Sequence, residues 1–212
     1  MKYKGIIFDL DGVICSTDRY HYLAWKTVAD RLGIYFDETI NHRLRGVSRM
    51  ESLEIILERC DRILSQEEKL ALATEKNDIY RGLLSGMTPA DLSREVKDTL
   101  DALRGKGLRL GIGSSSKNTR YILDRIGLGS FFDAVSDGNN ITRSKPDPEV
   151  FLKAAEYLGL APADCLVVED AVSGLQAAAA AGMDSAAVGD AAESGLAVYD
   201  LGTFSELLKC VD

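Results

Sequence analysis

Short apolar runs separated by amphipathic segments dominate the pattern of hydrophobic positions along the chain. Such runs, bounded by acids, glycines and serines, predict buried strands of a parallel sheet. The predicted strands cover residues 5–8, 109–113, 134–136, 165–168 and 185–188. The segments between them carry apolar residues at helical spacing, as Val96, Leu100 and Leu103 do. Strands that alternate with helices predict an α/β fold with helices on both faces of the sheet.

Residues from about 18 to 85 interrupt this alternation. They contain almost no strand signal, and their apolar residues recur at helical spacing, as at Leu53, Ile56 and Leu57. A helical block inserted after the first strand predicts a separate cap. We therefore expect an α/β core formed by residues 1–16 and 88–212, and a helical cap formed by residues 17–87.

Composition and charge restrict the classes of protein that fit. The chain has 212 residues, of which 46% are hydrophobic and 27% charged, as in an ordinary globular protein. Its net charge of -8 opposes binding to nucleic acid phosphates. The chain lacks a run of about 18 apolar residues, and its short apolar start ends at Asp9, unlike a signal peptide. We expect neither a nucleic-acid partner nor a membrane span.

The cysteines are scattered and show no close pair with metal-ligand spacing. They are Cys15, Cys60, Cys165 and Cys210. We therefore expect reduced thiols, which are typical of cytoplasmic proteins, and a cytoplasmic location. We also expect the protein to be a monomer.

Polar residues gather where the predicted strands end, which is where ligands bind in open α/β sheets. Asp9 and Asp11 follow the first strand and, being two apart on an extended segment, point to the same side. Two carboxylates there repel each other unless a cation or proton intervenes. One could attack phosphorus while the other moves a proton. An acidic turn that closes the strand is the alternative.

Two further clusters could receive an anion. The first follows the strand at 109–113 and consists of Ser114, Ser115, Ser116, Lys117 and Asn118. Hydroxyls and N–H groups at a helix start suit an anion, although Ser and Asn also serve as simple helix caps. The second is Lys145, which lies next to a proline that fixes the chain direction. Lys145 could neutralise phosphate, or it could be a solvated lysine beside a helix cap.

Glu169 and Asp170 follow the strand at 165–168. Acids at the mouth of a buried strand are poor core residues. Together with Asp9 they would form an oxygen-rich site of the kind that Mg²⁺ prefers. A helix cap at Asp170 is the alternative, and it is compatible with metal binding.

In this order, the clusters resemble the four motifs of the haloacid dehalogenase-like superfamily. The matching positions are Asp9 with Asp11, Ser114, Lys145, and Glu169 with Asp170. The resemblance covers essentially the whole chain and implies a Rossmann-like α/β core that carries a helical cap. It also implies that Asp9 is a phosphate-accepting nucleophile and that Asp11 is the general acid and base. One Mg²⁺ ion would be held by Asp9, the Asp11 carbonyl, Glu169 and Asp170.

The predicted cap resembles that of the β-phosphoglucomutases. The segment 44–49 is similar to their substrate loop, and segments at 21–25 and 76–78 are similar to theirs. The resemblance assigns substrate or phosphate binding to the residues His21, Trp25, Arg45, Gly46, Val47, Arg49, Lys76, Ser114, Ser115, Ser116, Lys117, Asn118 and Lys145. Without it, the cap residues would be ordinary packing or surface residues.

The resemblance implies conversion of β-D-glucose 1-phosphate to D-glucose 6-phosphate through a β-glucose 1,6-bisphosphate intermediate. The protein would therefore bind a phosphorylated sugar as its substrate. A sugar-phosphate phosphatase is the nearest alternative, because it shares all four core motifs. A non-catalytic phosphosugar-binding protein is disfavoured by four intact residues, namely Asp9, Asp11, Lys145 and Asp170. A dehalogenase is disfavoured because that reaction needs no second acid to protonate a sugar leaving group.

Overall fold

The computed structural model describes residues 2–45 and 47–211. Its centre is a six-stranded parallel sheet in the order β3-β2-β1-β4-β5-β6. The strands are β1 (Gly5–Phe8), β2 (Arg109–Gly113), β3 (Ala134–Ser136), β4 (Cys165–Glu169), β5 (Asp184–Ala187) and β6 (Tyr199–Asp200). The α/β fold with a parallel sheet is thus confirmed. The strand expected at 185–188 starts and ends one residue earlier, and β6 was not predicted.

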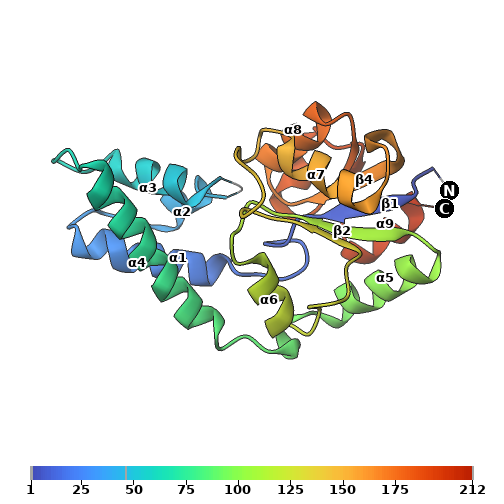
Figure 1. Cartoon of the computed structure of the whole chain (residues 1–212), viewed down its shortest axis with the longest axis horizontal. Helices are drawn as coiled ribbons and strands as arrows, with labels where there is room; N and C mark the ends of the chain where they lie inside the picture. Colours follow the sequence, from blue (N-terminus) through green and yellow to red (C-terminus); the bar gives the residue numbers. More distant parts are fainter. Residues whose placement is uncertain (1, 46, 212) are drawn as a thin grey trace.

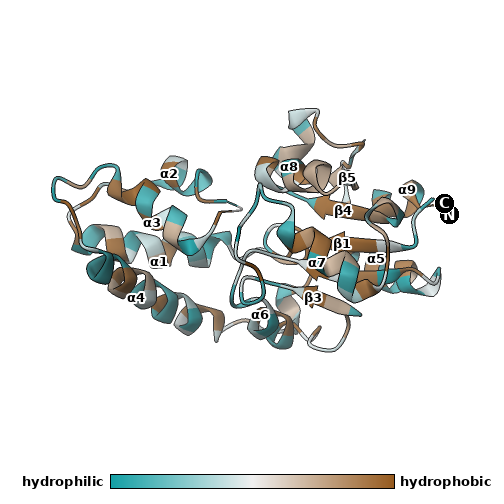
Figure 2. Cartoon of the chain, turned by 45° about the horizontal axis from the view of Figure 1, so that its top comes forward, coloured by the Kyte–Doolittle hydropathy of each residue, from teal (hydrophilic) through white to brown (hydrophobic). Residues whose placement is uncertain are grey.

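The central strands are buried on both faces, as their continuous apolar runs predict. Ile6, Ile7 and Phe8 of β1 have no exposed surface, and β1 pairs with β2 on one side and β4 on the other. The strands of the sheet stand out as hydrophobic in Figure 2. Because β1 is central, the residue that follows it, Asp9, emerges in the middle of the carboxyl edge of the sheet.

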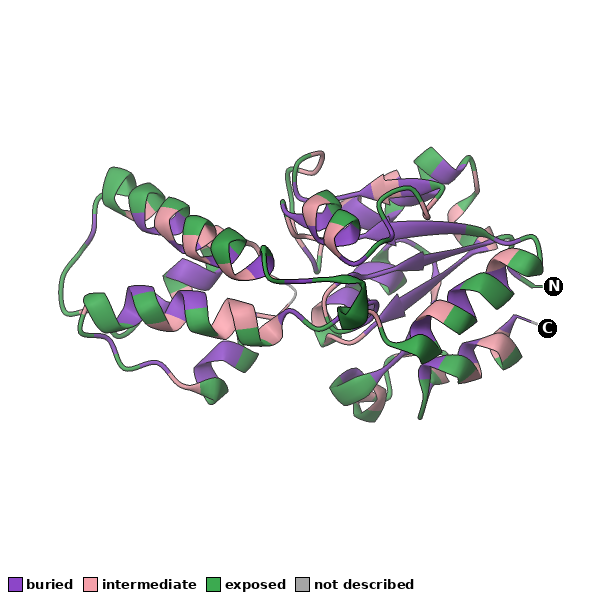
Figure 3. Cartoon of the chain, turned by 90° about the horizontal axis from the view of Figure 1, so that it is seen from below, coloured by how far each residue is buried: buried purple, intermediate pink, exposed green. Residues whose placement is uncertain are grey.

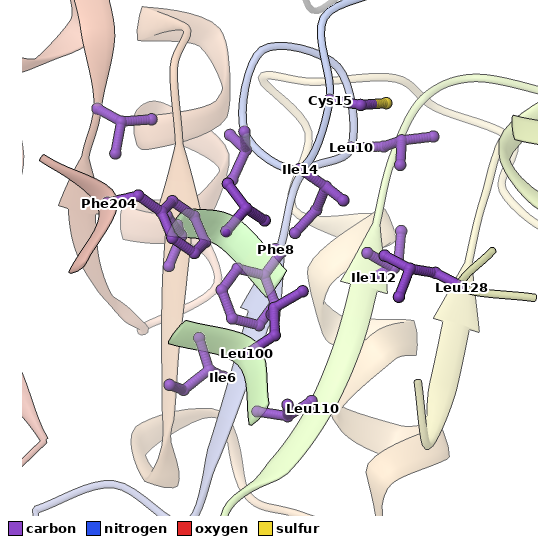
Figure 4. Close-up of a cluster of buried hydrophobic side chains, with 14 of the residues drawn as sticks. Ile6, Phe8, Leu10, Ile14, Cys15, Leu100, Leu110, Ile112, Leu128 and Phe204 are labelled. Atoms are coloured by element: carbon purple, nitrogen blue, oxygen red, sulfur yellow. The ribbon is translucent and has the colours of Figure 1, made fainter. Parts of the chain in front are cut away.

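Helices cover the two faces of the sheet, and alternate side chains of β1 contact different layers. Ile6 and Phe8 pack with α5 (Arg94–Gly105), whereas Ile7 packs with α7 (Glu149–Leu158) and α8 (Val172–Ala180). Figure 4 shows the first of these layers, in which Phe8 lies among Leu100, Ile112 and Phe204. The remaining core helices are α6 (Thr119–Arg125), α9 (Leu207–Cys210) and the short 3-10 helices η1 (Pro89–Asp91), η2 (Pro162–Asp164), η3 (Gly189–Ser194) and η4 (Phe204–Glu206).

A helical unit, which we call the cap, lies beside the sheet on the side away from the chain termini (Figure 1). It contains α1 (Asp18–Arg31), α2 (Glu38–His42), α3 (Arg49–Leu57) and α4 (Gln66–Leu84). Capping boxes at Ser48 and Ser65 fix where α3 and α4 begin. The cap has its own apolar cluster, including Trp25 and Leu53, and its helices bury their inner faces (Figure 3). The short α2 was not predicted.

Within the described ranges, no helix is both long and apolar enough to cross a membrane. The four cysteines are free thiols, as expected.

Candidate active site

A cleft of about 430 Å³ lies between the cap and the carboxyl edge of the sheet. A cavity of this size can hold a small organic molecule. Its wall is formed by residues from the ends of β1 and β2, from the loop around Lys145, and from α1, α3 and α4 of the cap. The parallel topology therefore brings together side chains that are far apart in sequence.

Asp9 lies at the base of the cleft and is 7% exposed. Its backbone N–H donates to the carbonyl of Val168, so the residue is held as an extension of β1. The ammonium of Lys145 lies 2.6 Å from Oδ1 of Asp9 and also contacts Oε1 of Glu169. Burial opposes the charged form of Lys145, but these two carboxylates outweigh burial and raise its pKa above the ordinary value. Lys145 is therefore a fixed positive charge in the site.

Three carboxylates, those of Asp9, Glu169 and Asp170, have oxygens within 4.8 Å of one another. Two glycines make room for this cluster, because a Cβ on Gly12 would lie 2.0 Å from Asp170 and one on Gly174 would lie 2.0 Å from Glu169. Gly12 also has a φ of +83°, which disfavours other residues. Ala171, not Asp170, occupies the N-cap position of α8, so helix capping does not explain Asp170.

The electrostatics of this cluster fit a divalent cation. Burial, followed by the charges of Glu169 and Asp9, raises the pKa of Asp170 to about 8. Burial also raises the pKa of Glu169 to about 7, against the opposing effect of Lys145. One lysine does not balance these carboxylates, and an all-oxygen donor set is what Mg²⁺ prefers. The acidic cluster can therefore hold a metal ion.

Asp11 lines the cleft, but its side chain is not part of the carboxylate cluster. Its Oδ1 accepts a hydrogen bond from the hydroxyl of Thr17, just before α1. Burial, reinforced by the charge of Asp9, raises the pKa of Asp11 to about 6. A carboxyl group with such a pKa can hold or release a proton near neutral pH. Thr17 was not among the predicted site residues; its position at the expected boundary between core and cap, six residues after Asp11, was the available signal.

The loop after β2 carries the predicted hydroxyl and amide groups into the same cleft. Ser114 is buried, and its Oγ accepts from the N–H of Ser116. Lys117 is exposed, whereas Asn118 is 5% exposed and hydrogen-bonds to the cap. Ser115 lines the cleft as well.

On the cap side, the side chain of Lys76 is buried among aromatic rings. Its ammonium is 2.8 Å from Nδ1 of His21 and lies over the rings of Trp25 and Tyr80, at 5.1 Å and 4.4 Å from their centroids. Burial and the nearby Arg49 lower the pKa of Lys76 to about 7. Burial also lowers the pKa of His21, so this imidazole is neutral and can accept from Lys76.

Residues 44, 45 and 47–49 line the cap side of the cleft. Arg45 pairs with Asp18 of α1 and with Asp190 of η3, at 3.4 Å and 2.9 Å. Val47 and Arg49 line the cleft, whereas the predicted Gly46 lies outside the described residues. Arg49 donates to Oδ1 of Asn77 at 2.7 Å.

The predicted site residues thus lie together. Within residues 2–45 and 47–211, each of them lines the cleft except Glu169, which is buried and bonded to Lys145. Two further residues, Asn77 and Arg81, hydrogen-bond to Asn118 and were not among the predicted site residues, although Asn77 lies in the segment 76–78 that resembles the β-phosphoglucomutases.

These features are those of a haloacid dehalogenase-like fold with a carboxylate-lined active-site cleft, and the comparisons agree. Residues 3–182 match the family model described as haloacid dehalogenase-like hydrolase, and the chain belongs to this family.

Several relatives are similar over most of their length. A β-phosphoglucomutase of Bacillus subtilis is 43% identical over 188 residues, covering 88% of this chain and 83% of the relative. A fructose-1-phosphate phosphatase of Escherichia coli is 35% identical over 185 residues, covering 87% of this chain and 95% of the relative. The crystal structure of a β-phosphoglucomutase from Clostridium difficile superposes with a TM-score of 0.91 at 36% identity, covering 97% of this chain and 93% of that one.

Proposed function

We propose that the protein is a β-phosphoglucomutase, which interconverts β-D-glucose 1-phosphate and D-glucose 6-phosphate through β-glucose 1,6-bisphosphate. The observation that carries this proposal is a second group of hydrogen-bond donors in the cleft, which could bind a second phosphate. Arg49 and Asn118 line the same cleft as Asp9, but within the described residues they share no hydrogen bond with the carboxylate cluster. A substrate with phosphates at both ends could use both sets. The similarity to two β-phosphoglucomutases supports this choice.

In this proposal, a carboxylate oxygen of Asp9 attacks phosphorus and forms an aspartyl phosphate, while the sugar oxygen leaves. Asp11 gives a proton to the leaving oxygen and takes one from the attacking hydroxyl in the reverse transfer. The raised pKa of Asp11, about 6, suits both directions near neutral pH. The hydroxyl of Thr17 holds the Asp11 carboxylate in place.

The acidic cluster would hold one Mg²⁺ through Asp9, Asp170 and the backbone carbonyl of Asp11, with Glu169 contributing directly or through water. When bound, the ion supplies positive charge that offsets the charge of the transferring phosphoryl group. Lys145 supplies a second positive charge, fixed by its contacts with Asp9 and Glu169. The Ser114 hydroxyl would donate to a phosphoryl oxygen. Such positioned charges provide most of the catalysis in phosphoryl transfer.

The cap, residues 17–87, would close over the phosphosugar. Arg49 would bind the non-reacting phosphate together with Ser116, Lys117 and Asn118. His21, Trp25 and Lys76 would contact the sugar, and Arg45 and Val47 would line the cap side of the cleft around it. Closure excludes water, so the phosphoryl group passes from Asp9 to a sugar hydroxyl instead of to water, and the Asp9 carboxylate is regenerated.

A sugar-phosphate phosphatase is the second candidate. It is favoured by the 35% identity to the fructose-1-phosphate phosphatase, because both activities use the same core residues. A monomeric state and a cytoplasmic location remain predictions.

The two candidates differ in product. Purified protein would be incubated with β-glucose 1-phosphate, Mg²⁺ and a trace of the bisphosphate, and glucose 6-phosphate and free phosphate would be measured together. A mutase forms glucose 6-phosphate faster than free phosphate. Free phosphate as the dominant product would instead assign the chain to the phosphatases.

A further inference from the structure

The amide of Asn77 connects the cap to the core. Asn77 belongs to α4, and its Oδ1 accepts one hydrogen bond from Arg49 of α3, at 2.7 Å. The same oxygen accepts a second one from Nδ2 of Asn118, at 3.0 Å, and Asn118 lies just after β2. A single oxygen atom of Asn77 therefore joins Arg49 of the cap to Asn118 of the core, which lies 41 positions after Asn77 in the chain.

The direction of these hydrogen bonds is fixed at both ends. Arg49 can only donate, so the atom of Asn77 that faces it is the oxygen. The other end of Asn118 faces Arg81, whose Nη1 donates to Oδ1 of Asn118 at 3.1 Å. Arg81 is itself packed against the ring of Tyr121, at 4.5 Å from the centroid. Neither amide can flip without placing a donor against a donor.

The side chain of Asn118 is committed to this connection. Asn118 occupies the N-cap position of α6, where an asparagine usually accepts from the first turn of its own helix. Its side chain makes no such bond, and the residue is 5% exposed. Nearby groups stabilise the turn in its place, since the N–H of Asn118 donates to Ser116 and the hydroxyl of Thr119 donates to the carbonyl of Ser116. Helix α6 therefore lacks a side-chain cap from Asn118, and the amide of Asn118 instead hydrogen-bonds to Asn77 of the cap.

We infer that Asn77 is a positioning residue, which holds Arg49 and Asn118 together as one preassembled site for the phosphate distant from Asp9. Asn77 itself does not line the cleft, whereas Arg49 and Asn118 do. Its role is therefore to set where the two donors point and to keep them paired across the cleft. This inference rests on the proposed function, because it requires a substrate with a second phosphate.

The test separates a two-phosphate ligand from a one-phosphate donor. Affinity for β-glucose 1,6-bisphosphate would be measured by calorimetry in an Asp9→Asn background, where turnover is blocked. Adding Asn77→Ala is expected to weaken this binding roughly tenfold, the effect of losing the acceptor of one charge-assisted hydrogen bond. In the presence of a native Asp9, Asn77→Ala should leave phosphorylation by acetyl phosphate unchanged, because this donor has no distant phosphate.

The matched control is Glu75→Ala on the same helix. Glu75 pairs with Arg31 inside the cap, so this variant loses an ion pair of α4 without touching the core. It should change neither readout. Combining Asn77→Ala with Asn118→Ala should cost less than the sum of the two single changes, since both break the hydrogen bond between Asn77 and Asn118.

Unchanged bisphosphate affinity in Asn77→Ala, or an equal loss with both ligands, would overturn the role of Asn77 while leaving the proposed function intact. If the Asp9→Asn protein did not bind the bisphosphate at all, the proposed function and this inference would both be wrong.

Discussion

The guanidinium of Arg45, which lines the cleft on the cap side, lies 2.9 Å from a carboxylate oxygen of Asp190, in η3 of the core. Its other nitrogen lies 3.4 Å from Asp18 in α1. Arg45 is therefore held between two acids, one in each unit. The ion pair between Arg45 and Asp190 joins the cap to η3, whereas the Asn77–Asn118 hydrogen bond joins α4 of the cap to the loop after β2.

Asp190→Ala removes the core partner of Arg45. The Asp190 side chain is 75% exposed, and ion pairs of this kind contribute at most about 1 kcal/mol. We expect less than roughly a fivefold change in mutase turnover, with a shift towards free phosphate, because the cap would close less often. The measurement is the ratio of glucose 6-phosphate to free phosphate at low and high salt. An effect above tenfold that salt does not reduce would mean that Asp190 acts in another way.

The core part of the site was predictable because it depends on topology. Strand-end positions in a parallel sheet converge whatever the loops do, so Asp9, Ser114, Lys145 and Asp170 could be brought together from the sequence alone. The strands were recognisable for a related reason. A strand buried on both faces needs a continuous apolar run, and residues 5–8 and 109–113 have one.

The contacts between the cap and the core could not be predicted in the same way. The hydrogen bond from Asn118 to Asn77 and the ion pair from Arg45 to Asp190 depend on the angle at which the two units meet. No periodicity encodes that angle. The two-residue strand β6 and the five-residue helix α2 are too short to produce a recognisable pattern.

Asp9→Asn should abolish labelling of the protein by a radioactive phosphoryl donor, because an amide cannot form the acyl phosphate. Asp11→Asn should still accept the label slowly, since it retains the nucleophile and loses only proton transfer. Acid-quenched protein would be counted after exposure to labelled acetyl phosphate. Label that persists in Asp9→Asn would place the nucleophile at another residue.

Asp170→Asn removes one carboxylate from the acidic cluster while preserving side-chain size. We expect the Mg²⁺ concentration needed for half-maximal activity to rise by about 10–100-fold, and chelation by EDTA to inactivate the unmodified enzyme. Asp200→Asn, in the edge strand β6, is a suitable control because Asp200 is exposed and lies outside the cleft. The same Mg²⁺ dependence in Asp170→Asn and the unmodified enzyme would place the ion elsewhere.

Lys76 should make stability depend on pH. Its pKa is about 7 in the folded chain, below the ordinary 10.5, because burial and Arg49 oppose its charge. Between these values the unfolded chain binds more protons, so the free energy of unfolding rises with pH. Relative to Lys76→Met, the unmodified protein should gain about 2 kcal/mol between pH 7 and pH 9. Below pH 7 the difference should be constant.

Urea unfolding at several pH values would measure this effect. Lys69→Met, on the same helix, provides the control, because Lys69 pairs with Glu54 near the surface of the cap. A pH-independent difference between the Lys76→Met variant and the unmodified protein would show that Lys76 titrates normally.

Arg49→Ala provides the sharpest separation of mutase from phosphatase. A mutase must hold a bisphosphate in two orientations, so the phosphate away from Asp9 needs its own cation. Arg49 lines the cleft and is already oriented by Asn77. Losing a charge-assisted contact costs on the order of 1.5–3 kcal/mol, or roughly tenfold to more than a hundredfold in binding. We therefore expect much weaker phosphosugar binding, with unchanged transfer from acetyl phosphate.

The comparison with Arg43→Ala makes this prediction specific. Arg43 is also a cap arginine, but it pairs with Glu58 on the surface at 2.7 Å and does not line the cleft. Arg43→Ala should therefore change neither phosphosugar binding nor phosphoryl transfer from acetyl phosphate. Arg49→Ala should also raise hydrolysis relative to mutase turnover, because a cap without its phosphate contact closes less often and admits water. If Arg49→Ala slowed both donors equally, Arg49 would serve only to hold the cap together, and the second phosphate would have to be bound by the core alone.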